Sequence, residues 1–500
     1  MATVTSAPSG DLRAVARGGV LNLLGAGYAA LVGFATATLV ARGLTHAQAG
    51  VFFAATGLFV VVSVVAKLGT PTGLVYWIAR LRTLDRPDLV RACLAVALRP
   101  VVWSSVALGV VGWVAAPWIT AVAGDAGFAT QLRILAVLLP VAALSDTLLA
   151  ATRGHRTMRP TVLVDRFGRS SLQLAGLVVV FSFAAPTSWY TLAWAAPWLV
   201  SAAVAWHYLA RLLPQPAAHT ASPGLRREFW GFTWPRGVAN VLQLLLQRLD
   251  VLLVAGLLGF APAAGYAVAT RFTVVGQLGN AAIGTAVEPR LAEALAHDDR
   301  ATAQRLYQTA TGWLVLTAWP VYLLTAIFAP LYLGLFGPSY ASRPAVAVVL
   351  LLCGAMLVAS GCGMVDVVLA MTGRTTWNLG NVSAALVTAV GLNLLLLPRL
   401  GIVGGGIAWA AAALVKNLLP LAQLSSGRGL HPFGRGTVTA AALAVGCFGV
   451  LPMVARIVAG PGLPALLAGA GAGAVCYLAG LWWLREPLRL SASRRPQEVT

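Results

Sequence analysis

The feature that most constrains this chain is a series of long apolar runs that recur from Gly18 almost to the C-terminus. A helix needs ~20 predominantly apolar residues to cross the hydrocarbon core of a bilayer. Cutting the sequence at interruptions rich in glycine, proline and arginine leaves fourteen candidate spans. They begin near Gly18, Gly50, Arg91, Gln131, Thr161, Ser188, Phe229, Pro262, Gln304, Arg343, Thr376, Gly401, Gly434 and Pro464. The sequence therefore predicts an all-α polytopic membrane protein with about fourteen transmembrane helices.

The composition excludes a water-soluble fold. Of the 500 residues, 59% are hydrophobic and only 10% are charged, whereas soluble domains have roughly 25% charged residues. In a soluble protein, the net charge of +20 would suggest binding to nucleic acid. In a membrane protein, the distribution of arginine among the loops explains this charge better.

The loops predict the orientation, because short cytoplasmic loops hold Lys and Arg in excess. Alternate loops on one side hold 22 arginines, and those on the other side hold four. This alternation predicts an even number of spans and both termini in the cytoplasm. The bias toward Arg and Ala suggests a bacterial coding sequence, so we expect the bacterial plasma membrane. The span from Val51 to Ile78 contains Lys67, Gly69 and Pro71, which predict a bend or local unwinding.

The chain lacks the motifs of common enzymes and metal sites. It has no G-x-x-x-x-G-K-[ST], H-E-x-x-H or D-x-D motif, and its five cysteines form no C-x-x-C pair. Its longest polar connections, residues 211–228 and 288–304, are too short for a folded domain. We expect neither enzyme activity nor a cofactor or metal. Without a nucleotide-binding motif, transport would draw on an ion gradient, such as that of a monovalent cation, on the membrane potential or on substrate flux.

The sequence also contains an internal similarity. The helices that begin near Gly18 and Phe229 open with Arg17-Gly18-x-x-x-Asn22 and Arg236-Gly237-x-x-Asn240. This pattern predicts two six-helix lobes in parallel orientation, and chance similarity between glycine-rich helices is the other explanation. The expected parts are a cytoplasmic tail 1–17, an N-lobe 18–213, a cytoplasmic linker 214–228, a C-lobe 229–424, a two-helix appendage 425–485 and a cytoplasmic tail 486–500. In transporters built from repeats, the substrate binds between the halves.

Ionisable residues inside the predicted spans indicate the cargo. An ionised group at the bilayer centre costs ~3 kcal/mol on insertion scales, so it should face protein, water or another charge. The basic residues are Lys67, Arg99, Arg166, Arg169, Arg236, Arg248, Arg271, Lys416 and Arg456, and the acidic residues are Asp146, Asp165, Asp250 and Asp366. The excess of cations predicts a cavity for an anionic passenger, because guanidinium groups bind phosphate oxygens bidentately.

Some of these cations are candidates for direct contact with the passenger. The candidates are Arg271, Arg248, Arg236, Arg166, Arg169 and Lys67. Arg271 is the best single phosphate candidate, although its side chain could instead extend to the nearer membrane interface. For Arg166 and Arg169, anchoring at the cytoplasmic interface explains their position equally well.

Arg248 and Asp250 cannot both face the cavity directly. At a spacing of i,i+2 on one helix they point to nearly opposite sides. We expect Asp250 to turn toward polar groups such as Asn393 while Arg248 flanks the cavity. Two structural salt bridges between helices are the other interpretation of this pair. We expect Asp146 to pair with an arginine of the neighbouring loop.

Several short motifs resemble one family of membrane transporters. They are Asn22…Val40-Ala41-Arg42-Gly43-Leu44…Gly50-Val51-Phe52, then Trp234-Pro235…Leu249-Asp250…Gly265-Tyr266, then Val287-Glu288-Pro289-x-Leu291-Ala292, and Gly373-Arg374…Leu392-Asn393…Leu397-Pro398-x-Leu400-Gly401-Ile402-x-Gly404-Gly405-Gly406-Ile407-Ala408. The pattern resembles the polysaccharide transporter branch of the multidrug/oligosaccharidyl-lipid/polysaccharide flippase superfamily. It extends over most of the chain and consists mainly of small residues and turn signals.

The resemblance implies two six-helix lobes that form a V around a central cavity, and alternating access of that cavity to the two sides. It implies movement of undecaprenyl-diphosphate-linked oligosaccharide across the membrane for the synthesis of cell-surface polysaccharides. Polymerases and glycosyltransferases of the same pathway would be its partners. Asp250 and Asn393 match two positions that hold a monovalent cation in some relatives, but Leu397 stands where a second acid would help.

The residues leave two other functions open. A multidrug and toxin exporter of related fold would carry organic cations, and its cavity should be rich in carboxylates. A membrane polymerase or ligase of the same pathway should have a long periplasmic loop. The excess of arginine argues against the exporter, and the short loops argue against the enzyme.

Overall fold

The computed structural model describes residues 9–123, 125–213, 224–372 and 375–485, and these ranges contain helices and no strands. Two compact units make up the chain, Met1–Ala267 (unit 1) and Val268–Thr500 (unit 2). The expected tails 1–17 and 486–500 and linker 214–228 lie wholly or partly outside the described residues. The division into six-helix lobes with an appendage stays a prediction.

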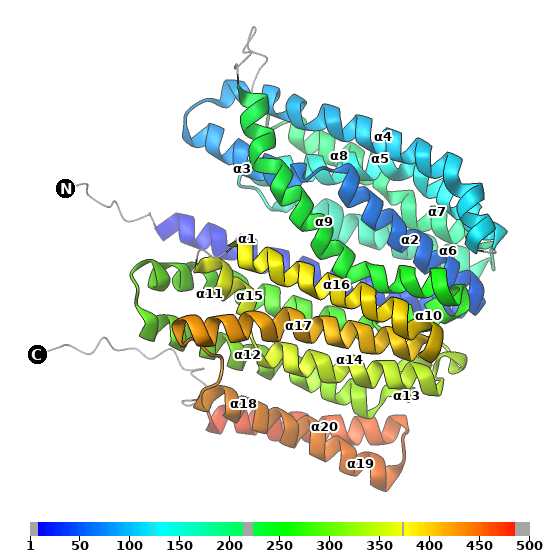
Figure 1. Cartoon of the computed structure of the whole chain (residues 1–500), viewed down its shortest axis with the longest axis vertical. Helices are drawn as coiled ribbons and strands as arrows, with labels where there is room; N and C mark the ends of the chain where they lie inside the picture. The colour runs from blue at the N-terminus through cyan, green and yellow to red at the C-terminus, as the bar shows by residue number, and fades with distance from the viewer. Residues whose placement is uncertain (1–8, 124, 214–223, 373–374, 486–500) are drawn as a thin grey trace, which may run out of the picture. The chain divides into compact units, whose positions relative to one another are not determined.

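Unit 1 holds the helices drawn from blue to green in Figure 1. They are α1 (Ser9–Gly43), α2 (His46–Ala66), α3 (Thr70–Thr83), η1 (Pro87–Leu89), α4 (Val90–Ala123), α5 (Ala126–Gly154), η2 (Thr161–Arg169), α6 (Ser170–Ser182), α7 (Thr187–Ala195), α8 (Pro197–Ala210), α9 (Leu225–Leu258) and the larger part of α10 (Phe260–Ala269). Helix α5 packs against α2, α3, α4 and α8, so it is central to this unit.

The predicted interruption of the second span is confirmed. Helix α2 ends at Ala66 and α3 begins at Thr70, while Leu68 and Gly69 adopt left-handed backbone angles with φ of 52° and 78°. Proline lies in the first turn of α3, where its missing amide hydrogen costs no helical hydrogen bond. Gly69 also lies against the backbone of Gly237 in α9, where a Cβ atom would come within 2.6 Å of the Gly237 Cα. A side chain at residue 69 would therefore clash.

The core near α3 is apolar and closely packed. Leu74 and Ile78 of α3 are fully buried with Leu148 of α5 and Phe229 of α9. Close packing of α3 with α9 is possible because Gly73 faces the Thr233 side chain, where a Cβ would come within 2.3 Å of its Oγ1. These contacts fix the positions of α3, α5 and α9 relative to one another within unit 1.

Unit 2 holds the remaining helices. They are η3 (Arg271–Thr273), α11 (Val274–Ala296), α12 (Arg300–Ile327), α13 (Ala329–Gly334), η4 (Pro338–Tyr340), α14 (Arg343–Gly361), α15 (Val365–Met371), α16 (Thr375–Leu400), α17 (Ile402–Arg428), α18 (Arg435–Ala444), η5 (Val445–Val450), α19 (Leu451–Ala459) and α20 (Leu463–Trp483). Helix α12 packs against α11, α14 and α18. The Tyr477 hydroxyl of α20 donates to the Leu316 carbonyl of α12 at 2.7 Å, which helps to fix the last helices to the unit.

Eleven helical segments of the described residues are long and apolar enough to cross a membrane. Three predicted spans are not among them, those that begin near Thr161, Ser188 and Pro262. Each is divided into shorter helices: η2 with α6, α7 with α8, and α10 with η3 and α11. The protein is a multi-pass membrane protein, and the count of fourteen spans stays a prediction.

Candidate functional site

A pocket of about 680 Å³ lies in unit 1 between α3, the end of α5 and α9. Its lining residues are Pro71, Thr72, Val75, Tyr76, Ala79, Arg80, Thr83, Arg153 and Phe232. The α3 residues recur at intervals of three and four, so they share one face of that helix. The lining contains two arginines and no carboxylate, so the pocket has a positive charge.

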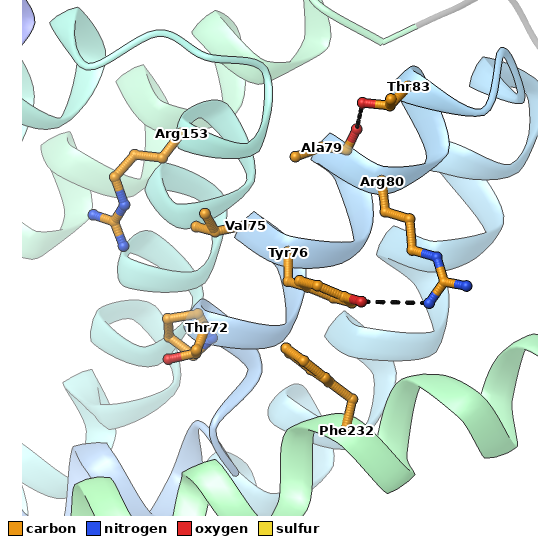
Figure 2. Close-up of a pocket in the computed structure, with 9 residues that line it drawn as sticks. Thr72, Val75, Tyr76, Ala79, Arg80, Thr83, Arg153 and Phe232 are labelled. Atoms are coloured by element: carbon orange, nitrogen blue, oxygen red, sulfur yellow. Dashed lines mark hydrogen bonds between the residues drawn. The ribbon is translucent and has the colours of Figure 1, made fainter. Parts of the chain in front are cut away.

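Two aromatic rings form one wall of the pocket. Tyr76 and Phe232 stack with ring centroids 3.9 Å apart and an interplanar angle of 16°. Figure 2 shows the Arg80 guanidinium directed at the Tyr76 hydroxyl, with 3.4 Å between Nη1 and the oxygen. Arg236 of α9, a predicted cavity cation, stacks on the Phe232 ring at 3.7 Å and donates to the Phe232 carbonyl at 3.0 Å. It therefore supports this wall.

Lys67, another predicted cavity cation, lies at the break between α2 and α3 and forms an ion pair. Its Nζ is 2.5 Å from Oδ2 of Asp146 in α5, and both side chains are largely buried. We expected Asp146 to pair with a loop arginine, and its direct partner is Lys67 instead. The reason is that the break places the C-terminal end of α2 against α5, within reach of a lysine side chain.

Arg166 and Arg169 lie in η2, a π-helical segment, and share the carboxylate of Asp165. Arg169 Nη2 is 2.6 Å from Asp165 Oδ1, and its guanidinium stacks on the Trp198 ring at 4.1 Å. Arg166 Nε is 3.8 Å from Asp165 Oδ2. Arg169 is thus held within the unit, whereas the Arg166 side chain stays 39% exposed.

Arg153 connects the pocket to these ion pairs. It lines the pocket from the last turn of α5, and its guanidinium is an electrostatic neighbour of Asp146, Asp165 and Arg166. Within the described residues, no direct ion pair joins Arg153 to either carboxylate. Among the residues that the structure describes, Arg153 therefore lines the pocket without a direct carboxylate partner.

Arg248 and Asp250 differ in burial along α9. Asp250 is 7% exposed and lies beside the Tyr266 phenol of α10, whereas Arg248 is exposed. In the described part of the chain, the Asp250 Oδ1 atom is buried without a hydrogen-bond partner. The two residues thus face different surroundings, as their spacing requires.

The two remaining predicted residues belong to unit 2. Asn393 in α16 is 1% exposed, and its Nδ2 donates to the Ala389 carbonyl at 2.8 Å. Its Oδ1 is buried without a hydrogen-bond partner among the described residues. Arg271 begins η3 and is an electrostatic neighbour of Tyr332.

The residues that line the pocket were not predicted from the sequence. Arg80 and Arg153 were grouped with the arginines of the loops, and Tyr76 and Phe232 were not singled out. A signal existed, because Tyr76 and Arg80 are spaced i,i+4, which places them on one face of a helix. Among the residues that the structure describes, there is no group of three His, Cys, Asp or Glu side chains that could hold a metal ion.

The family comparison covers the whole region that forms the pocket. A family model described as "Polysaccharide biosynthesis protein" matches residues 15–295, more than half of the chain. The chain belongs to the polysaccharide biosynthesis protein family. A second family model, MatE, matches residues 235–398. Both matches agree with the flippase superfamily that the sequence motifs resemble.

Solved structures show the fold of this polysaccharide biosynthesis family member. The lipid II flippase MurJ in its inward closed conformation is 9% identical, with a TM-score of 0.68 over 93% of this chain and 98% of the other. An inward-facing multidrug resistance MATE family transporter of the MOP superfamily is 17% identical, with a TM-score of 0.62 over 80% and 95%. A MOP superfamily transporter from Pyrococcus furiosus is 17% identical, with a TM-score of 0.55 over 83% and 96%. Curated proteins give no match.

These likenesses establish a MOP-type transporter fold for the family member. The predicted membership and the all-helical membrane fold are confirmed. At such low identities a structural likeness carries no information on the cargo, so the chemistry of the residues must indicate it.

Proposed function

We propose that this protein is a flippase that moves undecaprenyl-diphosphate-linked oligosaccharide across the plasma membrane for cell-surface polysaccharide synthesis. The observation that carries the proposal is the pocket of unit 1, whose lining has two arginines, two stacked aromatic rings and no carboxylate. The family match to polysaccharide biosynthesis proteins supports it. The protein acts as a transporter by alternating access and is not an enzyme.

The pocket chemistry suits each part of a sugar-diphosphate headgroup. Arg80 and Arg153 offer guanidinium donors that match phosphate oxygens. Tyr76 and Phe232 offer aromatic surface beside the sugar rings. A diphosphate in bare hydrocarbon would pay a large desolvation cost, which a polar and cationic lining reduces. The polyprenyl tail stays in the lipid.

The proposed orientation puts both termini and the arginine-rich loops in the cytoplasm. Arg80 and Arg153 lie in the last turns of α3 and α5, next to two of these loops. The pocket would therefore receive the headgroup at the cytoplasmic side, where lipid-linked sugars are assembled. Glycosyltransferases and a polymerase of the pathway would supply and consume the cargo.

The other predicted contacts keep their proposed roles. Arg271, Arg248 and the exposed part of Arg166 would contact the headgroup during transport. Asp250 in unit 1 and Asn393 in unit 2 each have a buried oxygen without a hydrogen-bond partner in the described residues, and each of these oxygens would suit a monovalent coupling cation. The membrane potential is the other source of energy.

A multidrug exporter is the second candidate, favoured by the MatE match to residues 235–398. Its organic cations would be repelled by the arginines of the pocket. Transport in proteoliposomes separates the two functions, with a fluorescent polyprenyl-diphosphate oligosaccharide as the probe.

We expect the double variant Arg80→Gln, Arg153→Gln to reduce lipid transport at least about tenfold, because one lost charge-assisted contact is worth about 1.5–3 kcal/mol. Arg271→Ala should reduce it as well. Arg159→Gln is the matched control, since Arg159 is exposed and lies outside the pocket lining. Wild-type rates in both the double variant and Arg271→Ala would refute the proposal.

A further inference from the structure

The break between α2 and α3 is held by backbone turn hydrogen bonds, such as Leu68 N to the Val65 carbonyl at 3.0 Å, and by side chains of its neighbours. The Ser104 hydroxyl of α4 donates to the Ala66 carbonyl at 2.6 Å, and the Thr70 hydroxyl donates to the Lys67 carbonyl at 2.8 Å. Leu68 has a positive φ, which is unfavourable for a residue with a side chain. The break is thus a defined conformation that depends on its neighbours.

The Lys67–Asp146 ion pair connects this break to α5. Lys67 is the cap residue of α2, so its side chain projects from the first residue after the helix. Either charge alone would be costly, because both side chains are largely buried. The pair therefore holds the α2 side of the break against α5.

Arg153 lies on the same face of α5 as Asp146. Seven residues separate them, which is about two turns and a rise of ~10 Å. Side chains on a helix lean toward its N-terminus, so the long Arg153 side chain extends back toward Asp146. The electrostatic interaction between the two groups agrees with this geometry. Arg153 thus lines the pocket and lies on the face of α5 that carries Asp146.

The charges of this network do not balance. Lys67, Arg153, Arg166 and Arg169 surround only two carboxylates, Asp146 and Asp165. Lys67 and Arg169 are in close pairs with these acids. An anion that enters the pocket at Arg153 would meet the surplus positive charge, and it would also place negative charge near Asp146.

We propose that the Lys67–Asp146 pair is a latch on the α2–α3 break, and that an anionic headgroup bound at Arg153 loosens it. The inference rests on the proposed function, because it assigns a coupling role to the same pocket. The bound anion neutralises Arg153, repels Asp146 and attracts Lys67, so the pair weakens and the break is freed to rearrange. Arg153 is a positioning residue as well as a ligand in this scheme.

A double-mutant cycle tests the coupling, with inorganic pyrophosphate as the probe and calorimetry on the full chain in nanodiscs. Asp146→Asn removes the charge that opposes the anion, so we expect pyrophosphate to bind on the order of tenfold more tightly. This gain should disappear in the Arg153→Gln background. It should persist in the matched control background Arg80→Gln, because Arg80 lines the pocket but lies outside the network. Equal gains in the two backgrounds would overturn the proposal.

Hydrogen–deuterium exchange reports on the latch itself. Pyrophosphate should increase exchange in the peptide that covers residues 67–73 in the wild type, and not in Arg153→Gln. The double variant Lys67→Met, Asp146→Asn keeps the charges balanced, which guards against misfolding, and it should exchange fast without pyrophosphate. Slow exchange in this folded double variant would contradict a latch.

The outcomes also separate this inference from the proposed function. If the binding effects are coupled but the protein moves no lipid-linked oligosaccharide, the latch is retained and the proposed flippase function is rejected. If lipid transport is normal but Asp146→Asn and Arg153→Gln have additive effects on pyrophosphate affinity, only the latch is rejected.

Discussion

Arg169 is held by three kinds of contact at once. It forms an ion pair with Asp165, donates from Nη1 to Gln173 Oε1 at 3.1 Å, and stacks on Trp198. Gln173 in turn donates to the Trp194 carbonyl at 2.7 Å. The sequence indicated that Arg169 needs a partner, but it did not distinguish this internal partner from a phosphate.

Loss of Arg169 should therefore destabilise the fold. Arg169→Gln leaves Asp165 without its main partner, and we expect the free energy of unfolding to fall by about 3 kcal/mol in chemical denaturation. Asp165→Asn added to this variant should recover part of the loss, because no unpaired charge then remains. An additive loss in the double variant would show that the pair contributes nothing to stability.

His155, in the loop after α5, predicts a pH dependence. Burial, and then the nearby Arg82 guanidinium, lower the pKa of His155 below its ordinary value of 6.5. The unfolded chain then binds the proton more readily, so this contribution to stability is complete above pH ~6.5 and is lost as the pH falls toward the folded pKa. We expect His155→Gln to lose less thermal stability than the wild type between about pH 7 and 5. Parallel melting curves would contradict this.

The individual residues of the pocket were harder to predict than the positive charge that they give it. Buried cations in apolar spans indicated an anionic passenger, and that argument needs only composition and hydropathy. Contacts between residues that are far apart in the sequence, such as Lys67 and Asp146, determine which cations are paired. Arg80 and Arg153 lie near loops, where a sequence pattern does not separate a ligand from a topological anchor.

At the scale of elements, the α2–α3 break was predictable because lysine, glycine and proline interrupt one apolar run. The backbone contact of Gly69 with Gly237 was not, since it joins distant segments. Gly69→Ala should cost more than about 2 kcal/mol of stability, because it combines a positive φ with a steric clash. Denaturation in detergent measures this cost.

Gly231→Ala in α9 is the matched control. No atom lies within 4 Å of a Cβ added there, so we expect no loss, or a gain of up to about 1 kcal/mol from helix propensity. Equal stability of the two alanine variants would show that the contact at Gly69 is not tight.

Two helix ends share one C-terminal geometry. Asp85 after α3 and Asp298 after α11 both have a left-handed backbone, with φ of 53° and 51°. In each case the amide of the next residue donates to a carbonyl five residues earlier, at 2.8 and 2.9 Å. The same Schellman pattern ends α6, where Ala184 has a φ of 47° and the Ala185 amide donates to the Val180 carbonyl at 3.2 Å. It is a common way to end a helix, so the internal repeat stays a prediction.

For the whole molecule, hydropathy alone predicted the membrane fold. Unsatisfied backbone groups are costly in lipid, so long apolar runs cross the membrane mainly as helices. Hydropathy did not predict which spans are broken into shorter helices. The π-helical segment η2 and the 3₁₀ segment η3 lie in two of the three spans that are divided.

We infer that positive charge in the pocket selects an anionic lipid headgroup. Reconstituted wild-type protein can be offered two cargoes under the same ion gradients, a polyprenyl-diphosphate oligosaccharide and an organic cation. We expect that the lipid crosses the membrane, that added pyrophosphate inhibits its movement, and that the cation stays in place. Movement of the organic cation without movement of the lipid would contradict it.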